Sequence, residues 1–149
     1  MDNHLKNLQD HPFSIAIIKW YNKNKRALPW RESPNPYRIW LSEIILQQTR
    51  VAQGLPYYNL FVNNYPEVYD LASASEDEVL RLWQGLGYYS RARNLHKCAK
   101  VIILTHNGNF PNTMKSLLAL PGIGRYTAAA IASLAFNEAV PVVDGNVYR

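Results

Sequence analysis

Glu43 has sequence surroundings that would suit acid-base chemistry. It lies between Ser42 and Ile44 in this chain of 149 residues, with Trp40 about one helical turn away. Apolar surroundings disfavour the charged form of a carboxyl group, so such an acid can stay protonated and donate a proton. A second interpretation is equally open, in which Glu43 is an exposed residue at the edge of a helix.

Asp144 is a second carboxylate whose position could serve chemistry. It follows the apolar Val142-Val143 and precedes Gly145-Asn146, which predicts a carboxylate at the N-cap of a helix near the end of the sequence. Capping alone would explain the residue. Its place shortly after a glycine-rich turn, however, predicts that it lies at the edge of a phosphate-binding surface.

That turn contains Pro121, Gly122 and Gly124, and it separates two apolar helical stretches. Glycine tolerates backbone conformations that other residues avoid, so the pattern predicts a helix, a tight hairpin and a second helix. Amide groups at the start of the second helix can approach an anion closely, and a nucleic-acid phosphate is the natural ligand. An ordinary helix-helix connection would fit Pro-Gly equally well. Two glycines around one apolar residue in a basic chain favour phosphate.

The elements that position these residues are predicted to be helices. Proline in the first turn, a capping box at Ser75 and Glu78, and glycine or asparagine stops mark their ends. Apolar residues with helical spacing predict helices over 13–21, 37–45, 56–62, from 76 to the glycines at 85 and 87, over 92–103, after 113 and over 126–136. Three prolines make 29–36 an irregular loop. No stretch alternates with period two, so the fold class is all-α.

One face of the helix over 92–103 is basic. Arg91, Arg93, Lys97 and Lys100 are expected on its solvent side, where they would extend a DNA footprint. The whole chain carries 16 Lys and Arg against 11 Asp and Glu, a net charge of +5, which favours a polyanionic partner. With 48% hydrophobic residues, the chain can form one domain with a hydrophobic core.

Cysteine content and the N-terminal residues narrow the class of protein further. Cys98 is the single cysteine, so these residues build neither a disulfide nor a cysteine-ligated cluster, and a buried thiol is expected. The N-terminal residues lack a long apolar segment, so we expect no signal peptide or membrane span and a cytoplasmic protein.

Several sequence blocks resemble one family. Residues 120–128 (LPGIGRYTA) and 140–149 (VPVVDGNVYR) resemble the helix-hairpin-helix DNA glycosylase superfamily. Residues 29–31 (PWR), 40–49 (WLSEIILQQT) and 85–95 (GLGYYSRARNL) narrow the resemblance to the MutY family of adenine DNA glycosylases. The blocks span most of residues 29–149, and their combination is very specific.

The resemblance implies a reaction and its catalytic residues. Adenine opposite 8-oxoguanine or guanine in double-stranded DNA would be flipped out and its N-glycosidic bond hydrolysed. Glu43 would protonate the departing adenine at N7, and Asp144 would stabilise the oxocarbenium-like sugar. Tyr126 and Asn146 match positions that orient the acid and the water.

The resemblance also implies binding residues. Trp30, Arg31 and Leu46 match positions that line the adenine pocket, while Gln48 and Tyr88 match residues that probe the stack around the oxidised guanine, with Thr49 beside them. Gly122, Ile123, Gly124 and Arg125 would bind DNA phosphate. The carbonyls of Leu118, Leu120 and Ile123 match those that hold an alkali ion, Na⁺ or K⁺, between hairpin and phosphate.

Position 126 bears on whether the DNA strand is cut. Superfamily members that cleave the strand carry a Schiff-base lysine here, because an amine can attack C1′ and support elimination. Tyr126 cannot do so. We therefore expect a monofunctional glycosylase that leaves the backbone intact.

The resemblance implies a domain plan as well. Residues 1–28 would form an N-terminal helix that packs toward an iron-sulfur domain, 29–139 a six-helix barrel with the hairpin at 113–136, and 140–149 the start of a second domain. Family members continue into a [4Fe-4S] cluster held by four cysteines and a C-terminal domain that reads 8-oxoguanine. Because these are absent after Arg149, we expect a fragment or truncated product.

Two alternatives stay open. The first is a mismatch thymine or uracil DNA glycosylase of the same superfamily, and the second a helix-hairpin-helix module that binds DNA without catalysis. Glu43 in its Gln-Gln-Thr context argues for adenine, and its pairing with Asp144 argues for an enzyme.

The protein is expected to act as a monomer at the bacterial nucleoid.

Overall fold

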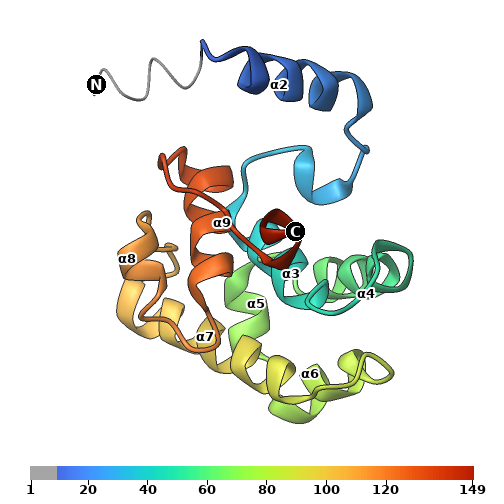
Figure 1. Ribbon diagram of the computed structural model, residues 1–149. Coiled ribbons are helices and arrows are strands. Elements are labelled where there is room, and N and C mark those ends of the chain that lie inside the picture. The colour runs from blue at the N-terminus through green and yellow to red at the C-terminus, as the bar shows by residue number, and fades with distance from the viewer. Residues whose placement is uncertain (1–9) are drawn as a thin grey trace. The chain divides into compact units, whose positions relative to one another are not determined.

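The computed structural model describes residues 10–149, and these residues contain helices, turns and no strand, which confirms the all-α prediction. They divide into two compact units, one that ends at Glu32 and one over Ser33–Arg149. The first unit holds α2 (Pro12–Asn24) and the short 3-10 helix η1 (Pro29–Arg31). The second holds α3 (Pro36–Ile45), α4 (Val51–Asn64), α5 (Val68–Ser73), α6 (Glu76–Trp83), α7 (Ser90–His106), α8 (Met114–Leu117), α9 (Arg125–Phe136) and α10 (Gly145–Tyr148) (Figure 1).

Local sequence signals account for most helix ends. The capping box predicted at the start of α6 is present, with the Ser75 side chain accepting from the Glu78 amide and the Glu78 side chain accepting from the Ser75 amide. Asn107, in the left-handed region at φ 52°, ends α7 as predicted. Pro12 occupies the first turn of α2 as predicted.

Three sequence expectations about helices need correction. The prediction that residues 29–36 form only a loop was wrong, because Pro29 begins η1 and Pro36 begins α3. Proline is tolerated at a first helical position, where its missing amide is not needed. Helix α4 begins at Val51, well before the predicted 56, and Pro56 is accommodated inside it. The six-residue α5 was missed because it is too short for a periodic signal.

The second unit packs around α3, α7 and α9. Helix α3 contacts α4 and α9, α7 contacts α5 and α6, and α8 lies against α9 (Figure 1). Trp40, Phe61 and Trp83 are fully buried, and the Phe61 and Trp83 rings meet edge to face at 5.9 Å between centroids. Alanines 128–130 and 132 of α9 are buried, which confirms the close packing expected of an alanine-rich helix. Cys98 is buried, as expected, and burial raises the pKa of its thiol to about 12.

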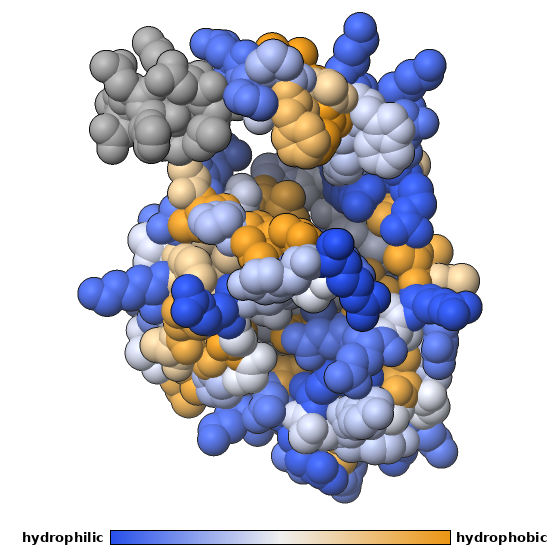
Figure 2. Space-filling model, in the orientation of Figure 1, coloured by the Kyte–Doolittle hydropathy of each residue, from blue (hydrophilic) through white to orange (hydrophobic). Residues whose placement is uncertain are grey.

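The molecular surface carries both polar and apolar side chains (Figure 2). On the face drawn in Figure 2, hydrophilic side chains protrude around the outline and the apolar residues form patches between them. Within residues 10–149 no helix is long and apolar enough to cross a membrane.

Candidate active site

Glu43 lies near the end of α3, on a helix that is otherwise almost entirely buried. Its neighbours Ser42 and Ile44 are 1% and 5% exposed, while Glu43 is half-buried, so it is not the exposed helix-edge residue of the alternative interpretation. Burial raises the pKa of the Glu43 carboxyl from 4.5 to about 7. The group therefore holds its proton up to neutral pH, as a general acid requires.

Asp144 has the opposite electrostatic environment. It caps α10, as predicted, and its Oδ1 accepts from the amides of Asn146 at 2.9 Å and Val147 at 3.0 Å. The Asn146 side-chain amide donates to Oδ2 at 3.1 Å, so these two predicted site residues are in contact. The hydrogen bond from the Val147 amide, followed by those from Asn146, lowers the pKa of Asp144. Asp144 is thus held as an anion.

Tyr126 is influenced by the charges of both carboxylates. It is the second residue of α9 and is 39% exposed. Burial is the largest cause of its raised pKa, and the charges of Glu43 and Asp144 each raise it further. The Tyr126 hydroxyl therefore lies within electrostatic range of both an acid from α3 and an anion that caps α10.

The glycine hairpin between α8 and α9 has the predicted form. Gly122 lies at φ 74°, and a Cβ there would come 2.8 Å from the Asn94 Cβ of α7. Gly124 is the N-cap of α9, where an added Cβ would meet open space and no side chain caps the helix amides. Buried Ile123 anchors the turn and exposed Arg125 begins α9. The first-turn amides of α9 are therefore available to donate hydrogen bonds to an external anion.

Two turns present further predicted site residues. Gln48 and Tyr88 both have left-handed backbones, at φ 57° and 47°, and Tyr88 is 70% exposed. Leu46 forms the C-cap of α3, and the Thr49 hydroxyl donates to the Gln47 carbonyl at 3.3 Å. The first turn follows the mostly buried helix α3, and the second lies between α6 and α7.

Trp30 and Arg31 belong to the first unit. Arg31 donates through Nη1 to the Arg26 carbonyl at 3.1 Å, and its guanidinium lies 5.9 Å from the centre of the Tyr21 ring. Their assignment to a base pocket with Glu43 stays a prediction.

The family resemblance implies two inorganic groups, an alkali ion and a [4Fe-4S] cluster, and these residues differ in how well they fit each. No cluster of three or more His, Cys, Asp or Glu side chains that could hold a metal ion occurs within residues 10–149. The carbonyls of Leu118, Leu120 and Ile123 lie in one hairpin turn, in which the Ile123 amide donates to the Leu120 oxygen at 3.3 Å, and such neutral oxygens suit an alkali ion. A [4Fe-4S] cluster does not fit these residues, because the single cysteine, Cys98, is buried.

Sequence reasoning assigned Arg91 wrongly. It was expected on a solvated face of α7, but its guanidinium donates to carbonyls at the end of α3, including Gln47 O at 2.8 Å. The spacing held a signal for this, since Arg91 continues the stripe formed by Leu95, Cys98 and Ile102, all buried. A charge on a buried stripe needs partners, which here are backbone oxygens.

The all-helical architecture with a helix-hairpin-helix between α8 and α9 is the fold of the helix-hairpin-helix DNA glycosylase class. The chain belongs to the HhH-GPD superfamily of base excision DNA repair proteins, whose family model matches residues 41–149. Its sequence is 46% identical over 138 residues to the adenine DNA glycosylase of Buchnera aphidicola subsp. Acyrthosiphon pisum, and 47% identical over 146 residues to that of Homo sapiens. In both comparisons 92% of this chain is covered.

The chain spans only part of these relatives, 39% of the Buchnera protein and 27% of the human one. Solved structures agree on the fold. A thermostable thymine-DNA glycosylase matches with a TM-score of 0.84 and 32% identity, covering 97% of this chain and 66% of its own. Endonuclease III in a non-covalent DNA complex matches with a TM-score of 0.75 and 24% identity, covering 91% of this chain and 64% of its own.

Proposed function

We propose that this protein is a monofunctional adenine DNA glycosylase that hydrolyses the N-glycosidic bond of adenine opposite 8-oxoguanine or guanine in double-stranded DNA. The observation that carries the proposal is that the pKa values of two carboxyl groups, Glu43 and Asp144, shift in opposite directions, and that both groups influence Tyr126. Glu43 has its pKa raised to about 7 and Asp144 has its pKa lowered. Glycoside hydrolysis needs such a pair, one group protonated and one ionised. The sequence likeness to adenine DNA glycosylases supports the choice of base.

The proposed reaction begins with proton transfer. Glu43 donates its proton to N7 of the extruded adenine, and the bond from C1′ to the base nitrogen breaks with its electron pair moving into the adenine ring. Asp144 stabilises the positive sugar by its charge. Water then adds at C1′ and gives a proton to the ionised Glu43, which restores the acid and leaves an abasic site. Tyr126 orients Glu43, and Asn146 orients the water beside Asp144.

Other predicted residues would hold the DNA. The hairpin residues Gly122, Ile123, Gly124 and Arg125 contact phosphate, and an alkali ion at the Leu118, Leu120 and Ile123 carbonyls would supply a positive charge there. As the family resemblance implies, Trp30, Arg31 and Leu46 would each contact the adenine, and Gln48, Thr49 and Tyr88 would meet the stack around the opposite base. The steps above use only residues of this chain. The cysteine ligands of an iron-sulfur cluster would have to come from residues outside these 149.

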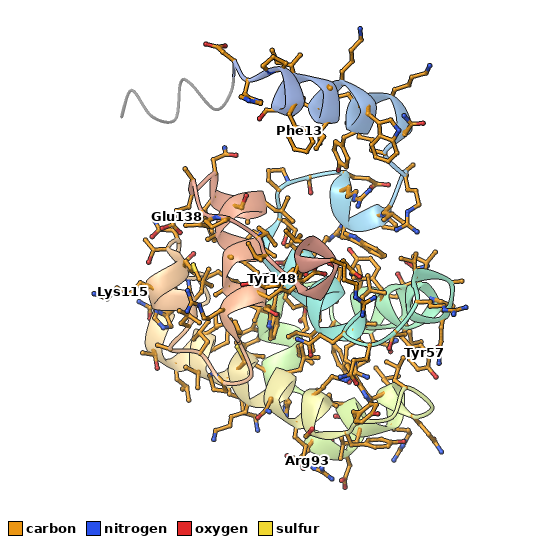
Figure 3. All side chains as sticks on the ribbon, in the orientation of Figure 1. Phe13, Tyr57, Arg93, Lys115, Glu138 and Tyr148 are labelled. Atoms are coloured by element: carbon orange, nitrogen blue, oxygen red, sulfur yellow. The ribbon has the colours of Figure 1, made fainter. Side chains whose placement is uncertain are left out.

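The predicted domain plan and setting are part of the same proposal. Helix α2 exposes a large apolar surface, with Phe13 68% and Trp20 65% exposed (Figure 3 labels Phe13), and we propose that it packs toward an iron-sulfur domain. Residues 29–139 would form the barrel and 140–149 the start of a second domain. The protein would act as a monomer on DNA in the bacterial cytoplasm.

The test is base release from synthetic duplexes by the protein as its gene encodes it. We expect release of adenine opposite 8-oxoguanine and guanine, and no covalent adduct on borohydride treatment, because Tyr126 has no amine. E43Q should slow release about a hundred-fold or more while DNA affinity changes little, since a general acid contributes about 10² to 10⁴. E76Q is the matched control at an exposed glutamate of α6.

Three outcomes would contradict the proposal. Release of thymine or uracil in place of adenine would indicate a mismatch glycosylase, the activity for which the thermostable structural relative is named. DNA binding without release of any base, by wild type and E43Q alike, would indicate a binding module. A borohydride-trapped adduct would contradict monofunctional chemistry.

A further inference from the structure

One arginine ties together the two turns that carry Gln48 and Tyr88. Arg91 Nη1 donates to the carbonyls of Gln47 at 2.8 Å, Ile44 at 3.0 Å and Ile45 at 3.3 Å. Its Nη2 donates to the carbonyls of Leu86 and Gly87, each at 3.4 Å. The first three oxygens belong to the end of α3 and the turn after it, and the other two to the turn before α7. A single planar cation therefore joins residues 44–47 to residues 86–87, two segments that are distant in sequence.

The contacts suit a cation at this place. The last carbonyls of a helix lack partners within the helix and carry partial negative charge, so the half-buried Arg91 guanidinium at the end of α3 satisfies and stabilises them. The Arg91 guanidinium also lies 5.0 Å from the centre of the Trp83 ring and 5.9 Å from that of Tyr88. Trp83 donates in turn to the Gly87 carbonyl at 3.0 Å. Arg91 thus contacts the Tyr88 ring as well as the backbone of its turn.

Both turns need such support. Gln48 and Tyr88 are non-glycine residues in the left-handed region, a conformation that persists only where the surroundings determine it. Arg91 supplies part of these surroundings through its hydrogen bonds to the Gln47 and Gly87 carbonyls, each next to one of the two residues.

We propose that Arg91 is a positioning residue that holds Gln48 and Tyr88 at a fixed spacing, so that an amide and an aromatic ring meet the DNA base stack together. This inference rests on the proposed function, in which these two side chains probe the base opposite the adenine. An amide can donate to and accept from base edges, and a tyrosine ring can stack on a base. Discrimination requires both at one spacing, because a loose pair would fit the right and the wrong base alike.

The decisive variant is R91K, which keeps the charge but replaces a planar fork by a single ammonium that cannot span both sets of carbonyls. R93K is the matched control, since Arg93 lies on the outside of the same helix, 3.8 Å from Glu76 and 56% exposed (Figure 3). Hydrogen exchange of the amides of Leu46, Thr49 and Leu86, which donate within the two turns, measures the support directly. We expect these turn amides to exchange about ten-fold faster in R91K than in wild type and at the wild-type rate in R93K. The amides of α9 should exchange at the wild-type rate in both variants.

The second readout is the preference for the opposite base. The ratio of single-turnover adenine release opposite 8-oxoguanine to that opposite guanine should fall at least about three-fold in R91K, with the pH profile of release unchanged because Glu43 is untouched. R91M should increase the exchange rate and reduce the ratio further than R91K does. Unchanged exchange in the turns of R91K would overturn the positioning role, and loosened turns with an unchanged ratio would overturn the link to discrimination. Wild-type protein that releases no adenine would instead refute the proposed function, and the exchange measurement would still decide the support role.

Discussion

At the scale of single residues, environment decides what each carboxylate can do. Glu43 and Asp144 carry the same functional group, yet burial raises the pKa of the first and amide donors lower the pKa of the second. Proton donation and charge stabilisation are thereby separated between two groups that both influence Tyr126. A pair with similar pKa values would not divide the two tasks at neutral pH.

The raised pKa of Glu43 predicts a pH-dependent cost to stability. Well below pH 4.5 the carboxyl is protonated in both folded and unfolded protein, and well above pH 7 it is ionised in both. Between these values the unfolded state loses the proton first, so the free energy of unfolding falls as pH rises. E43Q has no proton to lose. Its advantage over wild type should grow from about zero well below pH 4.5 to on the order of 2 kcal/mol at pH 8.

Thermal unfolding of the two proteins across this pH range measures the difference, with E76Q as the exposed control. A constant difference between wild type and E43Q would contradict the burial of an ionisable acid at position 43.

At the scale of elements, the two glycines of the hairpin have different roles, Gly122 in forming the turn and Gly124 in leaving the start of α9 open. Gly122 adopts a left-handed backbone against α7, whereas Gly124 has φ −87° and open space where a Cβ would be. The first position makes the turn possible, and the second leaves the start of α9 accessible.

Alanine at each glycine should therefore have a different effect. G122A forces a left-handed alanine and a clash with Asn94, and should lower the free energy of unfolding by about 2 kcal/mol or more. G124A should change stability by less than about 1 kcal/mol, because its backbone is accessible to any residue. It should nevertheless weaken DNA binding about ten-fold by placing a methyl group where phosphate approaches.

Chemical denaturation and fluorescence anisotropy with a labelled duplex give the two quantities. Equal losses of stability in both variants would contradict this division of roles.

At the scale of the whole molecule, charge governs association with DNA. The chain has a net charge of +5, and its exposed cations include Arg125, the first residue of α9 directly after the hairpin. Contacts with phosphates release counterions from DNA, so the binding constant depends on salt.

We expect the dissociation constant for duplex DNA to rise about ten-fold or more between 50 and 200 mM NaCl, with a linear plot of log K against log salt. R125Q should reduce the slope, while E76Q should not. A salt-independent constant would show that the protein does not bind through phosphates.

Much of this fold could be predicted from short stretches of sequence. Capping residues, glycines in turns and apolar spacing act over a few residues, which is why the ends of α6 and α7, the hairpin and the Asp144 cap agree with the sequence. The same local rules failed where a short helix had no periodic pattern, as in α5.

What the sequence by itself determined is therefore most of the helices and many of their ends, and it singled out the residues that we propose as acid, anion and phosphate ligand. Only the tertiary structure decided that Glu43 is half-buried with a raised pKa, and that Arg91 faces inward to the end of α3. The physical reason is range. Burial and the partners of a charge are set by groups far apart in the chain, such as Arg91 and Ile44, which are 47 residues apart, and no local pattern encodes them.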